Sequence, residues 1–338
     1  MSTPPTLRDV AAHAGVHVST ASRVIRGEHA RVRPDTVERV LASARQLGFQ
    51  RNRWAAGLRS GRTGVIGVLV PRITDVVLAT LFEAIEQAAS EAGYQAVVAS
   101  SWDDPEIRQE RVARYRAERV DGMIFGDART SDSLLRGLAA ESVPFVLVSR
   151  TSRGLPGIAG KDRAGGGMVA QHLVELGCRN LAVIAGPDYA STATDRVTGF
   201  LATALRCGST VRPELVVNST FDVDGGYRAM QVVLSRQVPD GVFAVNDFAA
   251  IGAIGALREH GLEIGRDVAL VGYNDISVAA QLPTPLTSVR TPLDDMGRAA
   301  FAALVQRMGG APVQSMKLAP TLIVRESTLA FSRARVPS

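Results

Sequence analysis

Lysine, cysteine and long apolar runs are nearly absent from this sequence. Lys161 and Lys317 are its only lysines, so arginine supplies almost all of the positive charge. The two cysteines, Cys178 and Cys207, have neither the pattern of a disulfide framework nor the spacing of metal ligands, which predicts ordinary thiols in a reducing compartment and no metal site. No apolar run approaches a membrane span, and no apolar signal region opens the chain. These absences predict a soluble cytoplasmic protein without a membrane partner.

Motifs of the common enzyme classes are absent as well. The chain contains no P-loop, HExxH or GxSxG pattern, and its three consecutive glycines at residues 165–167 lack a dinucleotide-binding fingerprint. We therefore expect no catalytic activity and no cofactor. A rival interpretation, a periplasmic solute-binding protein, requires a signal peptide where this chain has a basic segment.

The positive charge is concentrated at the start of the chain. Residues 1–62 contain eleven arginines and four acidic residues, a net charge of +7, whereas the remaining 27 basic and 29 acidic residues give −2. A basic segment ahead of a nearly neutral body is typical of a nucleic-acid-binding protein. The alternative is a solvated basic face without a partner.

Two short amphipathic helices joined by a tight turn are predicted near the N-terminus. Gly15 supplies the backbone freedom that the turn needs, and Val16 can fill the angle between the helices. The second helix presents Val18, Ser19 and Arg23 outward. The pattern is that of a helix-turn-helix, whose second helix enters the DNA major groove, and the alternative is a plain helical hairpin. The inward-facing residues are Leu7, Val10, Ala11, Ala14, Ala21, Val24 and Ile25.

A third helix, from about Pro34 to Leu47, completes a compact head. Pro34 suits the first helical turn, and Gly48 ends the helix. The basic residues 51–62 that follow can form a helix of two turns, which is marginal in water by itself. We expect a partner to order this segment, and the alternative is a plain flexible linker.

From residue 65 onward, short β-branched runs alternate with amphipathic helical segments. This alternation predicts parallel sheets flanked by helices. The run is too long for one doubly wound domain of ordinary size, so we expect two α/β subdomains, with a ligand site in the cleft beyond the carboxyl ends of the strands. The strand-like runs are residues 65–70, 96–99, 122–125, 145–148, 181–184, 241–245 and 268–271.

Several short motifs follow one another along the chain in a fixed order and spacing. They are residues 6–11, 14–16, 20–24, 47–49 and 62–68, followed by Arg119-Val120-Asp121-Gly122, Glu175-Leu176-Gly177, Ala244-Val245-Asn246-Asp247, Val271-Gly272-Tyr273-Asn274-Asp275 and Pro285-Leu286-Thr287-Ser288-Val289. Each motif is weakly specific alone. Together they resemble the LacI/GalR transcriptional regulators over essentially the whole chain.

This resemblance implies an all-α three-helix helix-turn-helix head and an α/β periplasmic-binding-protein-like core of two doubly wound parallel-sheet subdomains. In this family the chain crosses between the subdomains three times, here near residues 160, 288 and 320. The implied domains are a head at 1–50, a hinge at 51–62, a core at 63–332 and a tail at 333–338. The core divides into subdomain one, about 63–160 with 289–319, and subdomain two, about 161–288 with 320–332.

The resemblance also implies which residues of the second helix contact DNA. Arg23 lies where the family directs an arginine toward base edges, and an arginine can bind guanine O6 and N7 with two hydrogen bonds. His17 stands where serine is usual, and histidine is a poorer helix cap. Contact with DNA and a plain surface position stay open for it. The other candidates, for base or phosphate contacts, are Val18, Ser19, Thr20 and Ser22.

Residues 51–62 match the family's hinge helix, which enters the minor groove. Leu58 would wedge between base pairs and kink the DNA, and the alternative is packing against its own core. Trp54 and Ala56 depart from common hinge patterns. The candidate DNA contacts in this segment are Asn52, Arg53, Ala55 and Leu58.

Six residues are implied to bind a small-molecule effector in the cleft: Asp75, Arg150, Arg196, Phe221, Asn246 and Asn274. Arg196 matches the family's ligand-binding arginine, and Phe221 lies where an aromatic ring commonly stacks on the ligand. Fixed amides such as those of Asn246 and Asn274 suit hydroxyl-rich ligands. Asn274 replaces a common aspartate, which removes a carboxylate from the site. The amides lead us to expect a sugar. The lost carboxylate, with Arg150 and Arg196 retained, adds a sugar acid or a sugar phosphate as a further hypothesis.

The expected function is that of an allosteric transcriptional repressor. It would bind a pseudopalindromic double-stranded operator on the nucleoid as a homodimer, with one head on each half-site. Effector binding would change the relation of the two subdomains and thereby the DNA affinity. The segment after Thr328 is short and lacks a leucine heptad, which favours a dimer over a tetramer.

Overall fold

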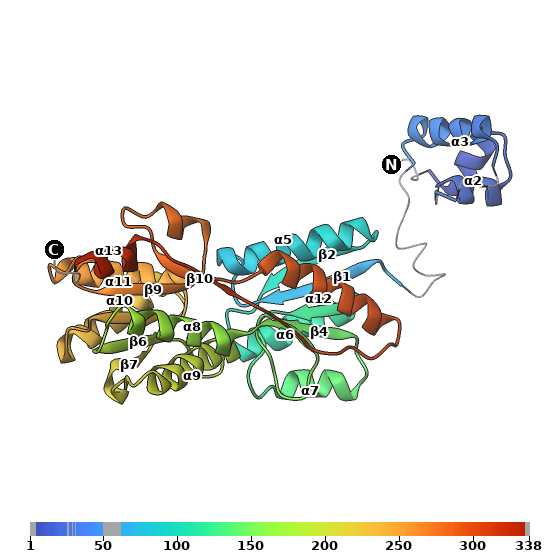
Figure 1. The fold of residues 1–338 in the computed structure, drawn as a ribbon. Helices are drawn as coiled ribbons and strands as arrows, with labels where there is room; N and C mark the ends of the chain where they lie inside the picture. The colour runs from blue at the N-terminus through green and yellow to red at the C-terminus, as the bar shows by residue number, and fades with distance from the viewer. Residues whose placement is uncertain (1–4, 26, 29, 31, 50–61, 335–338) are drawn as a thin grey trace. The chain divides into compact units, whose positions relative to one another are not determined.

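The computed structural model describes residues 5–25, 27–28, 30, 32–49 and 62–334, and Figure 1 shows their fold. The chain divides into two compact units, residues 1–63 and residues 64–338. The hinge candidates Asn52, Arg53, Ala55 and Leu58 lie outside the described residues.

Among the described residues of the head, the helices are α1 (Leu7–His13), α2 (Val18–Ile25) and α3 (Pro34–Gln46). A capping box begins α1, because Thr6 Oγ1 accepts a hydrogen bond from the Asp9 N–H while the Asp9 carboxylate accepts one from the Thr6 N–H. Gly15 and Gly48 follow α1 and α3 with φ of +62° and +63°, where a side chain would be strained. The buried head core consists of Val10, Ala11, Ala14, Ala21, Val24, Val40 and Ala44.

The described residues of the second unit form two six-stranded sheets. Sheet one has the order β11-β5-β4-β3-β1-β2, and sheet two has the order β12-β10-β9-β8-β6-β7. Neighbouring strands are parallel except for β10 and β12. Both sheets therefore share a doubly wound order, in which ligands bind beyond the carboxyl ends of the strands where the order reverses. That reversal lies between β1 and β3 in sheet one and between β6 and β8 in sheet two.

We call the half built on sheet one subdomain one and the half built on sheet two subdomain two. The strands of sheet one are β1 (Val65–Val70), β2 (Gln95–Ser100), β3 (Gly122–Phe125), β4 (Phe145–Val148), β5 (Gly157–Gly160) and β11 (Met316–Leu318). Those of sheet two are β6 (Leu181–Ala185), β7 (Val216–Asn218), β8 (Gly241–Ala244), β9 (Ala269–Asn274), β10 (Thr287–Arg290) and β12 (Thr321–Ile323).

Helices cover both faces of each sheet, as Figure 1 shows. In subdomain one they are α5 (Val76–Glu91) and α12 (Leu293–Met308) on one face, with α6 (Pro105–Ala117) and α7 (Ser133–Ala140) on the other. In subdomain two they are α10 (Val223–Arg236) and α11 (Asp247–Glu259) on one face, with α8 (Asp162–Glu175) and α9 (Ser191–Arg206) on the other. The remaining helices are η1 (Pro213–Leu215), η2 (Ser277–Gln281) and α13 (Glu326–Ala334). Within the described residues, none of the helices combines the length and apolar character that crossing a membrane requires.

Three passages of the chain connect the subdomains. Residues 160–161 join β5 to α8, and residues 319–320 join β11 to β12. The remaining passage lies at 291–292 rather than near 288, because β10 continues to Arg290, which pairs with Asn274 and Thr321. All three passages involve strands toward the β11 and β12 edges of the sheets.

Glycines allow α8 and α9 to touch along their backbones. A Cβ atom added at Gly166 would lie 2.0 Å from the Arg196 carbonyl oxygen, and one at Gly199 would lie 1.9 Å from the Arg163 carbonyl oxygen. The glycine run at 165–167 thus has a packing role. It fixes the backbone of Arg196 against α8, which bears directly on the site.

Candidate DNA-binding surface and effector site

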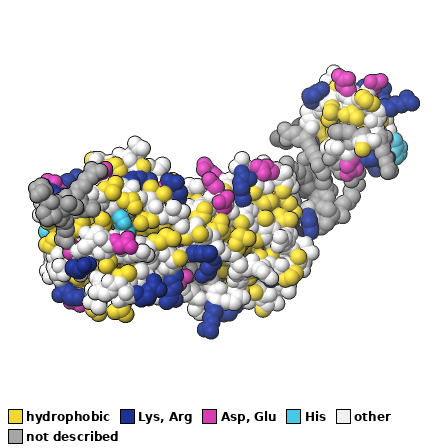
Figure 2. All heavy atoms as spheres, viewed as in Figure 1, with side chains coloured by type: hydrophobic (Ala, Val, Ile, Leu, Met, Phe, Trp, Pro, Cys, Tyr) yellow, Lys and Arg dark blue, Asp and Glu magenta, His cyan; other side chains and the backbone are white. Residues whose placement is uncertain are grey.

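In the head, one face of α2 is exposed to solvent. Val18, Ser19 and Arg23 are exposed, whereas Ala21 and Val24 are buried against α1 and α3. Figure 2 shows dark blue basic side chains and a cyan histidine on the visible surface of the head. The structure also leaves Thr20 and Ser22 half-buried at the sides of this face. A helix with a polar, partly basic free face is the geometry that major-groove binding needs.

His17 takes a capping role at the start of α2. Its Nδ1 atom lies 3.3 Å from the Ser19 backbone nitrogen, which donates to it, and 2.8 Å from Ser19 Oγ. The histidine ring therefore satisfies an N–H group of the first helical turn, as a serine oxygen would. The expectation of a poorer cap did not foresee this ring-nitrogen contact, and the contact leaves the other ring nitrogen as the group that can meet DNA.

Of the six predicted effector residues in the second unit, Arg150, Phe221, Asn246 and Arg196 are connected by short contacts. The Arg150 guanidinium lies 5.5 Å from the centre of the Phe221 ring, and Asn246 Nδ2 donates to the Phe221 carbonyl oxygen at 2.8 Å. Arg196 Nη1 donates to the carbonyl oxygen of Val245, the residue before Asn246, at 2.7 Å. We call the six residues the central polar cluster. Its contacts join loops from both subdomains at the carboxyl ends of the strands.

Arg196 is held entirely by subdomain two. Its Nε donates to Asp162 Oδ1 at 2.7 Å, and its guanidinium lies 3.7 Å from the centre of the Tyr273 ring. Burial raises the pKa of the Asp162 carboxyl, and the neighbouring Arg196 opposes that shift. The arginine is thus placed between a carboxylate and an aromatic face before any ligand arrives.

Arg150 is held by a loop of subdomain one. Its two terminal nitrogens form a forked ion pair with Asp103, at 2.5 Å and 3.0 Å from the two carboxylate oxygens. Asp103 has a left-handed φ of +57°, which is uncommon for a residue with a side chain. Both Asp103 oxygens accept from the Arg150 guanidinium, and Arg196 is paired with Asp162. The positive charge of each arginine in the cluster is therefore already balanced by a carboxylate.

Two members of the cluster cap helices. Asp75 Oδ1 accepts from the Val77 N–H at 3.0 Å and begins α5, while Asn246 Oδ1 accepts from the Ala249 N–H at 2.9 Å and begins α11. Burial raises the pKa of Asp75, against the Val77 hydrogen bond and the charges of Arg150 and Arg196. Each subdomain therefore points one capping side chain and one helix N-terminus toward the cluster.

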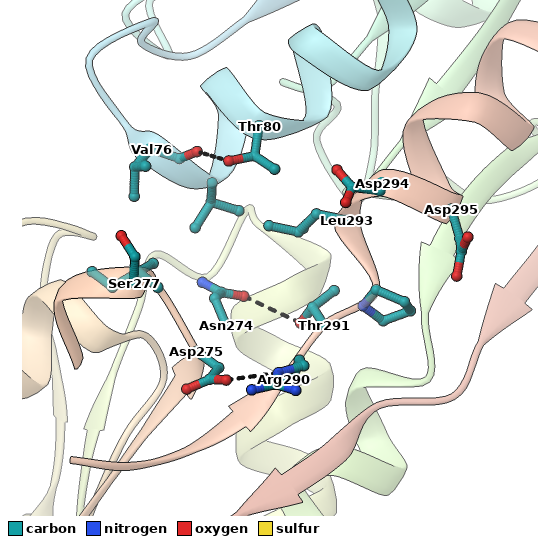
Figure 3. Close-up of a pocket in the computed structure, with 13 residues that line it drawn as sticks. Val76, Thr80, Asn274, Asp275, Ser277, Arg290, Thr291, Leu293, Asp294 and Asp295 are labelled. Carbon is teal, nitrogen blue, oxygen red and sulfur yellow. Dashed lines mark hydrogen bonds and ion pairs between the residues drawn. The ribbon is translucent and has the colours of Figure 1, made fainter. Parts of the chain in front are cut away.

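Asn274 also borders a cavity of about 390 Å³ beside the passage at 291–292. Figure 3 shows Val76 and Thr80 of α5 across from Asn274 and Ser277, with Asp275 paired to Arg290 at its edge. Of the six cluster residues, Asn274 alone lines this cavity. Asn274 has a φ of +100°, and its Oδ1 accepts from Thr291 Oγ1 at 3.4 Å.

A buried carboxyl, Asp247, lies directly after Asn246. Ser288 Oγ donates to its Oδ1 at 2.6 Å, and the Ile276 N–H donates to its Oδ2 at 2.8 Å. Burial raises the pKa of Asp247 to about 7, although these hydrogen bonds act against the shift. These hydrogen bonds connect the start of α11 to Ile276, which follows β9, and to Ser288 in β10.

Sequence reasoning missed the partners that orient the cluster. Asp103, Asp162 and Tyr273 each hold an arginine of the cluster, and Tyr189 joins Asp103 from the other subdomain with its hydroxyl 3.2 Å from Asp103 Oδ2. Their positions within a few residues of the ends of β2, β5 and β6, or within β9, are the signal that could have found them, because the carboxyl ends of the strands meet at the site. Among the described residues, no group of three or more histidine, cysteine or acidic side chains is arranged to hold a metal ion.

Comparison with known families matches both units. Residues 6–52 match the family described as bacterial regulatory proteins, lacI family, and residues 170–328 match the periplasmic binding protein-like domain. These matches agree with the resemblance and with the fold class predicted from the sequence.

Whole-chain relatives extend the match. The regulator CelR of Thermobifida fusca is 36% identical over 337 residues, covering 96% of this chain and 98% of CelR, and DegA of Bacillus subtilis is 31% identical over 330 residues, covering 96% and 98%. Among solved structures, a lac repressor dimer bound to operator and the anti-inducer ONPF has a TM-score of 0.87 at 28% identity, covering 97% of this chain and 100% of that chain. A CelR–cellobiose complex has a TM-score of 0.74 at 34% identity, covering 96% and 99%. The chain therefore belongs to the LacI family of bacterial transcriptional regulators.

Proposed function

We propose that this regulator is a cytoplasmic repressor that binds a pseudopalindromic operator as a homodimer and responds to a neutral sugar. The observation that carries the sugar assignment is the pairing of both cluster arginines with carboxylates. DNA affinity changes when the sugar occupies the central polar cluster and alters the relation of the subdomains.

The operator contacts follow from the free face of α2. Arg23 donates to guanine in the major groove, Val18 and Ser19 contact neighbouring base edges, and Thr20 and Ser22 contact phosphates. His17 holds the start of the helix while its outer ring nitrogen faces the DNA. The hinge candidates Asn52, Arg53, Ala55 and Leu58 complete the interface in the minor groove.

A neutral ligand suits the charges around the cluster. Arg150 and Arg196 are paired with Asp103 and Asp162, and Asp75 adds a further carboxyl. An anionic ligand would have to displace a carboxylate from its arginine or lie beside unbalanced negative charge. Sugar hydroxyls both donate and accept, so they can share the remaining hydrogen-bonding positions of these groups without breaking either ion pair. Phe221 offers an aromatic face for the apolar side of a sugar ring.

Two similar structures support this assignment. One is a complex of CelR with cellobiose, and the other is a lac repressor dimer on its operator. The similarity covers nearly the whole of this chain in both cases. A neutral sugar effector and a dimer with paired heads are therefore consistent with the fold that this chain adopts.

A mobility-shift assay tests the DNA part of the proposal. DNA from upstream of the gene should be retarded at low salt, and Arg23→Ala should weaken that binding by about tenfold to a hundredfold because it removes a base contact. Arg136→Ala, which removes an exposed arginine of α7, is the matched control and should bind normally. Absence of retardation, or equal losses in both variants, contradicts the proposal.

Thermal melting tests the effector class. Glucose, maltose and cellobiose are compared with gluconate and glucose 6-phosphate at equal concentrations. We expect at least one neutral sugar to raise the melting temperature, because a ligand that binds the folded state stabilises it. Stabilisation by the anionic compounds alone would contradict a neutral effector.

A further inference from the structure

Tyr189 extends from subdomain two into the loops of subdomain one. It lies between β6 and α9, yet its hydroxyl donates to Asp103 Oδ2 at 3.2 Å and its carbonyl oxygen accepts from the Thr130 N–H at 2.9 Å. The Arg129 guanidinium lies 4.1 Å from the centre of its ring, which is within cation–π range. These partners come from the loops that follow β2 and β3.

The residues that receive Tyr189 are themselves fixed within subdomain one. Asp103 forms the forked pair with Arg150, and Arg129 Nη1 donates to the Asp103 carbonyl oxygen at 3.3 Å. Next to Tyr189, Ser191 Oγ accepts from the Thr151 N–H at 2.7 Å. The contacts that build this seat for Tyr189 therefore lie within subdomain one, whereas the contacts that Tyr189 makes with Asp103, Arg129 and Thr130 cross between the subdomains.

The seat lies away from the three passages that connect the subdomains. The three passages of the chain lie toward the β11 and β12 edges, whereas Asp103 follows β2 at the opposite edge of sheet one and Arg129 and Thr130 follow the inner strand β3. A hinge motion about the passages separates the far edge most, so contacts at that edge oppose opening most effectively.

We propose that Tyr189 and its seat, formed by Asp103, Arg129 and Thr130, are a latch that holds the two subdomains closed. Tyr189 is a positioning residue, because it acts through Arg150 and through α9 rather than by touching the effector. Ser191 begins α9, and Arg196 lies on the same helix, so the latch sets the distance between the arginines of the two subdomains. That consequence for the effector rests on the proposed function, whereas the closure itself does not.

Amide hydrogen exchange measures the latch without any effector or DNA. The Thr130 and Thr151 amides donate to acceptors in subdomain two, so they exchange when the subdomains separate. The Leu135 amide donates to Asp132 within subdomain one and serves as the internal reference. Exchange is followed on the full chain at neutral pH.

Two substitutions divide the latch into its parts. Tyr189→Phe removes the hydroxyl and keeps the ring, so exchange at the Thr130 and Thr151 amides should rise about fivefold. Tyr189→Ala removes both and should raise it by about tenfold to a hundredfold. Tyr227→Phe, whose hydroxyl donates to Glu259 inside subdomain two, is the matched control and should change neither amide.

The outcomes separate a latch from general stability. Faster exchange at Thr130 and Thr151 with an unchanged Leu135 amide supports the latch. Unchanged exchange at the two crossing amides, or an equal rise at Leu135, overturns it. If Tyr189→Ala fails to fold, Tyr189→Phe decides the question by itself. Because no ligand or DNA is present, this result is independent of whether the chain binds sugar or an operator.

Discussion

The two arginines of the central polar cluster are held in different ways by the two subdomains. Arg196 lies on α9, between Asp162 and Tyr273 of its own subdomain. Glycines allow the backbones of α8 and α9 to come into close contact. Arg150 lies on a loop, is paired with Asp103 in a second loop, and reaches toward Phe221 and Tyr189 of the other subdomain. The Arg196 side of the site, which we call the prebuilt wall, is thus held within one subdomain. The Arg150 side combines an ion pair inside subdomain one with ring contacts that form only when the subdomains are closed.

The largest expected effect is the contrast between Arg196→Ala and Arg150→Ala. The Asp162 side chain is 6% exposed, so losing Arg196 leaves a buried carboxylate and should lower the free energy of unfolding by about 4 kcal/mol at pH 8. The Asp103 side chain is 18% exposed and keeps its Tyr189 hydrogen bond, so Arg150→Ala should cost about 1 kcal/mol. Urea unfolding measures both, and equal costs would break the comparison.

The next largest expected effect is the change in the free energy of unfolding with pH that Asp247 causes. In the unfolded chain its carboxyl has the ordinary pKa of 3.8, whereas in the folded chain burial raises the pKa to about 7. The folded chain therefore holds a proton in this window that the unfolded chain has released, so the free energy of unfolding falls as pH rises from about 4 to about 7. Above that window the loss is complete.

Asp247→Asn isolates this contribution. The amide stays neutral, can accept from the Ile276 N–H and can donate to Ser288 Oγ. Between pH 5 and pH 8 the wild-type chain should lose on the order of 3 kcal/mol more stability than the variant. Other titrating groups are common to both proteins and cancel in the difference. Parallel stability curves would show that Asp247 is not the titrating group.

Gly166→Ala tests how the prebuilt wall is made. The added Cβ meets the Arg196 carbonyl oxygen at 2.0 Å, so α8 and α9 must separate at a cost of about 2–3 kcal/mol. Gly255→Ala in α11 is the matched control, because its Cβ meets only Tyr227 Cδ2 at 3.5 Å. We expect the control to be neutral or slightly stabilising in thermal unfolding. Equal destabilisation by both changes would exclude close helix contact as the cause.

The smallest expected effect is the difference in stability between substitutions at the two capping residues, Asn246 and Asp75. Asn246→Asp keeps the acceptor for the Ala249 N–H but loses the donor to the Phe221 carbonyl oxygen, which should cost about 1 kcal/mol. Asp75→Asn keeps the acceptor for the Val77 N–H and should change stability by less than about 0.5 kcal/mol. Denaturant titrations resolve the difference, and a reversed order would contradict the assigned hydrogen bonds.

The sequence predicts the elements whose residues carry a repeating pattern. The helix pair around Gly15 follows from apolar periodicity and the start of the third helix from Pro34. The strands β1, β2, β3, β4, β6, β8 and β9 follow from short β-branched runs, and the structure contains all of these elements. The sequence does not predict five of the strands. Strands β7, β11 and β12 are only three residues long and carry no usable period, while β5 (Gly157–Gly160) and β10 (Thr287–Arg290) lack a continuous apolar run. Their pairing depends on tertiary contacts.

The candidate site divides in the same way. Motif positions indicate Arg150, Arg196 and Asn246, but spacing alone does not show that Asp103 pairs with Arg150 or that Tyr189 crosses between the subdomains. These partners are distant in sequence and meet only because parallel strands bring their carboxyl ends to one edge. His17 is a second example, since its capping contact depends on a ring orientation that residue type does not specify.

The most direct test of the account is the operator affinity of the full chain, measured by fluorescence anisotropy with and without a neutral sugar that raises its melting temperature. Arg196→Lys, which keeps a cation beside Asp162 but loses the guanidinium fork, is measured in parallel. We predict that the sugar shifts the dissociation constant for DNA by about tenfold or more in the wild-type chain and far less in the variant. An equal shift in both proteins, or a shift caused only by glucose 6-phosphate, would contradict it.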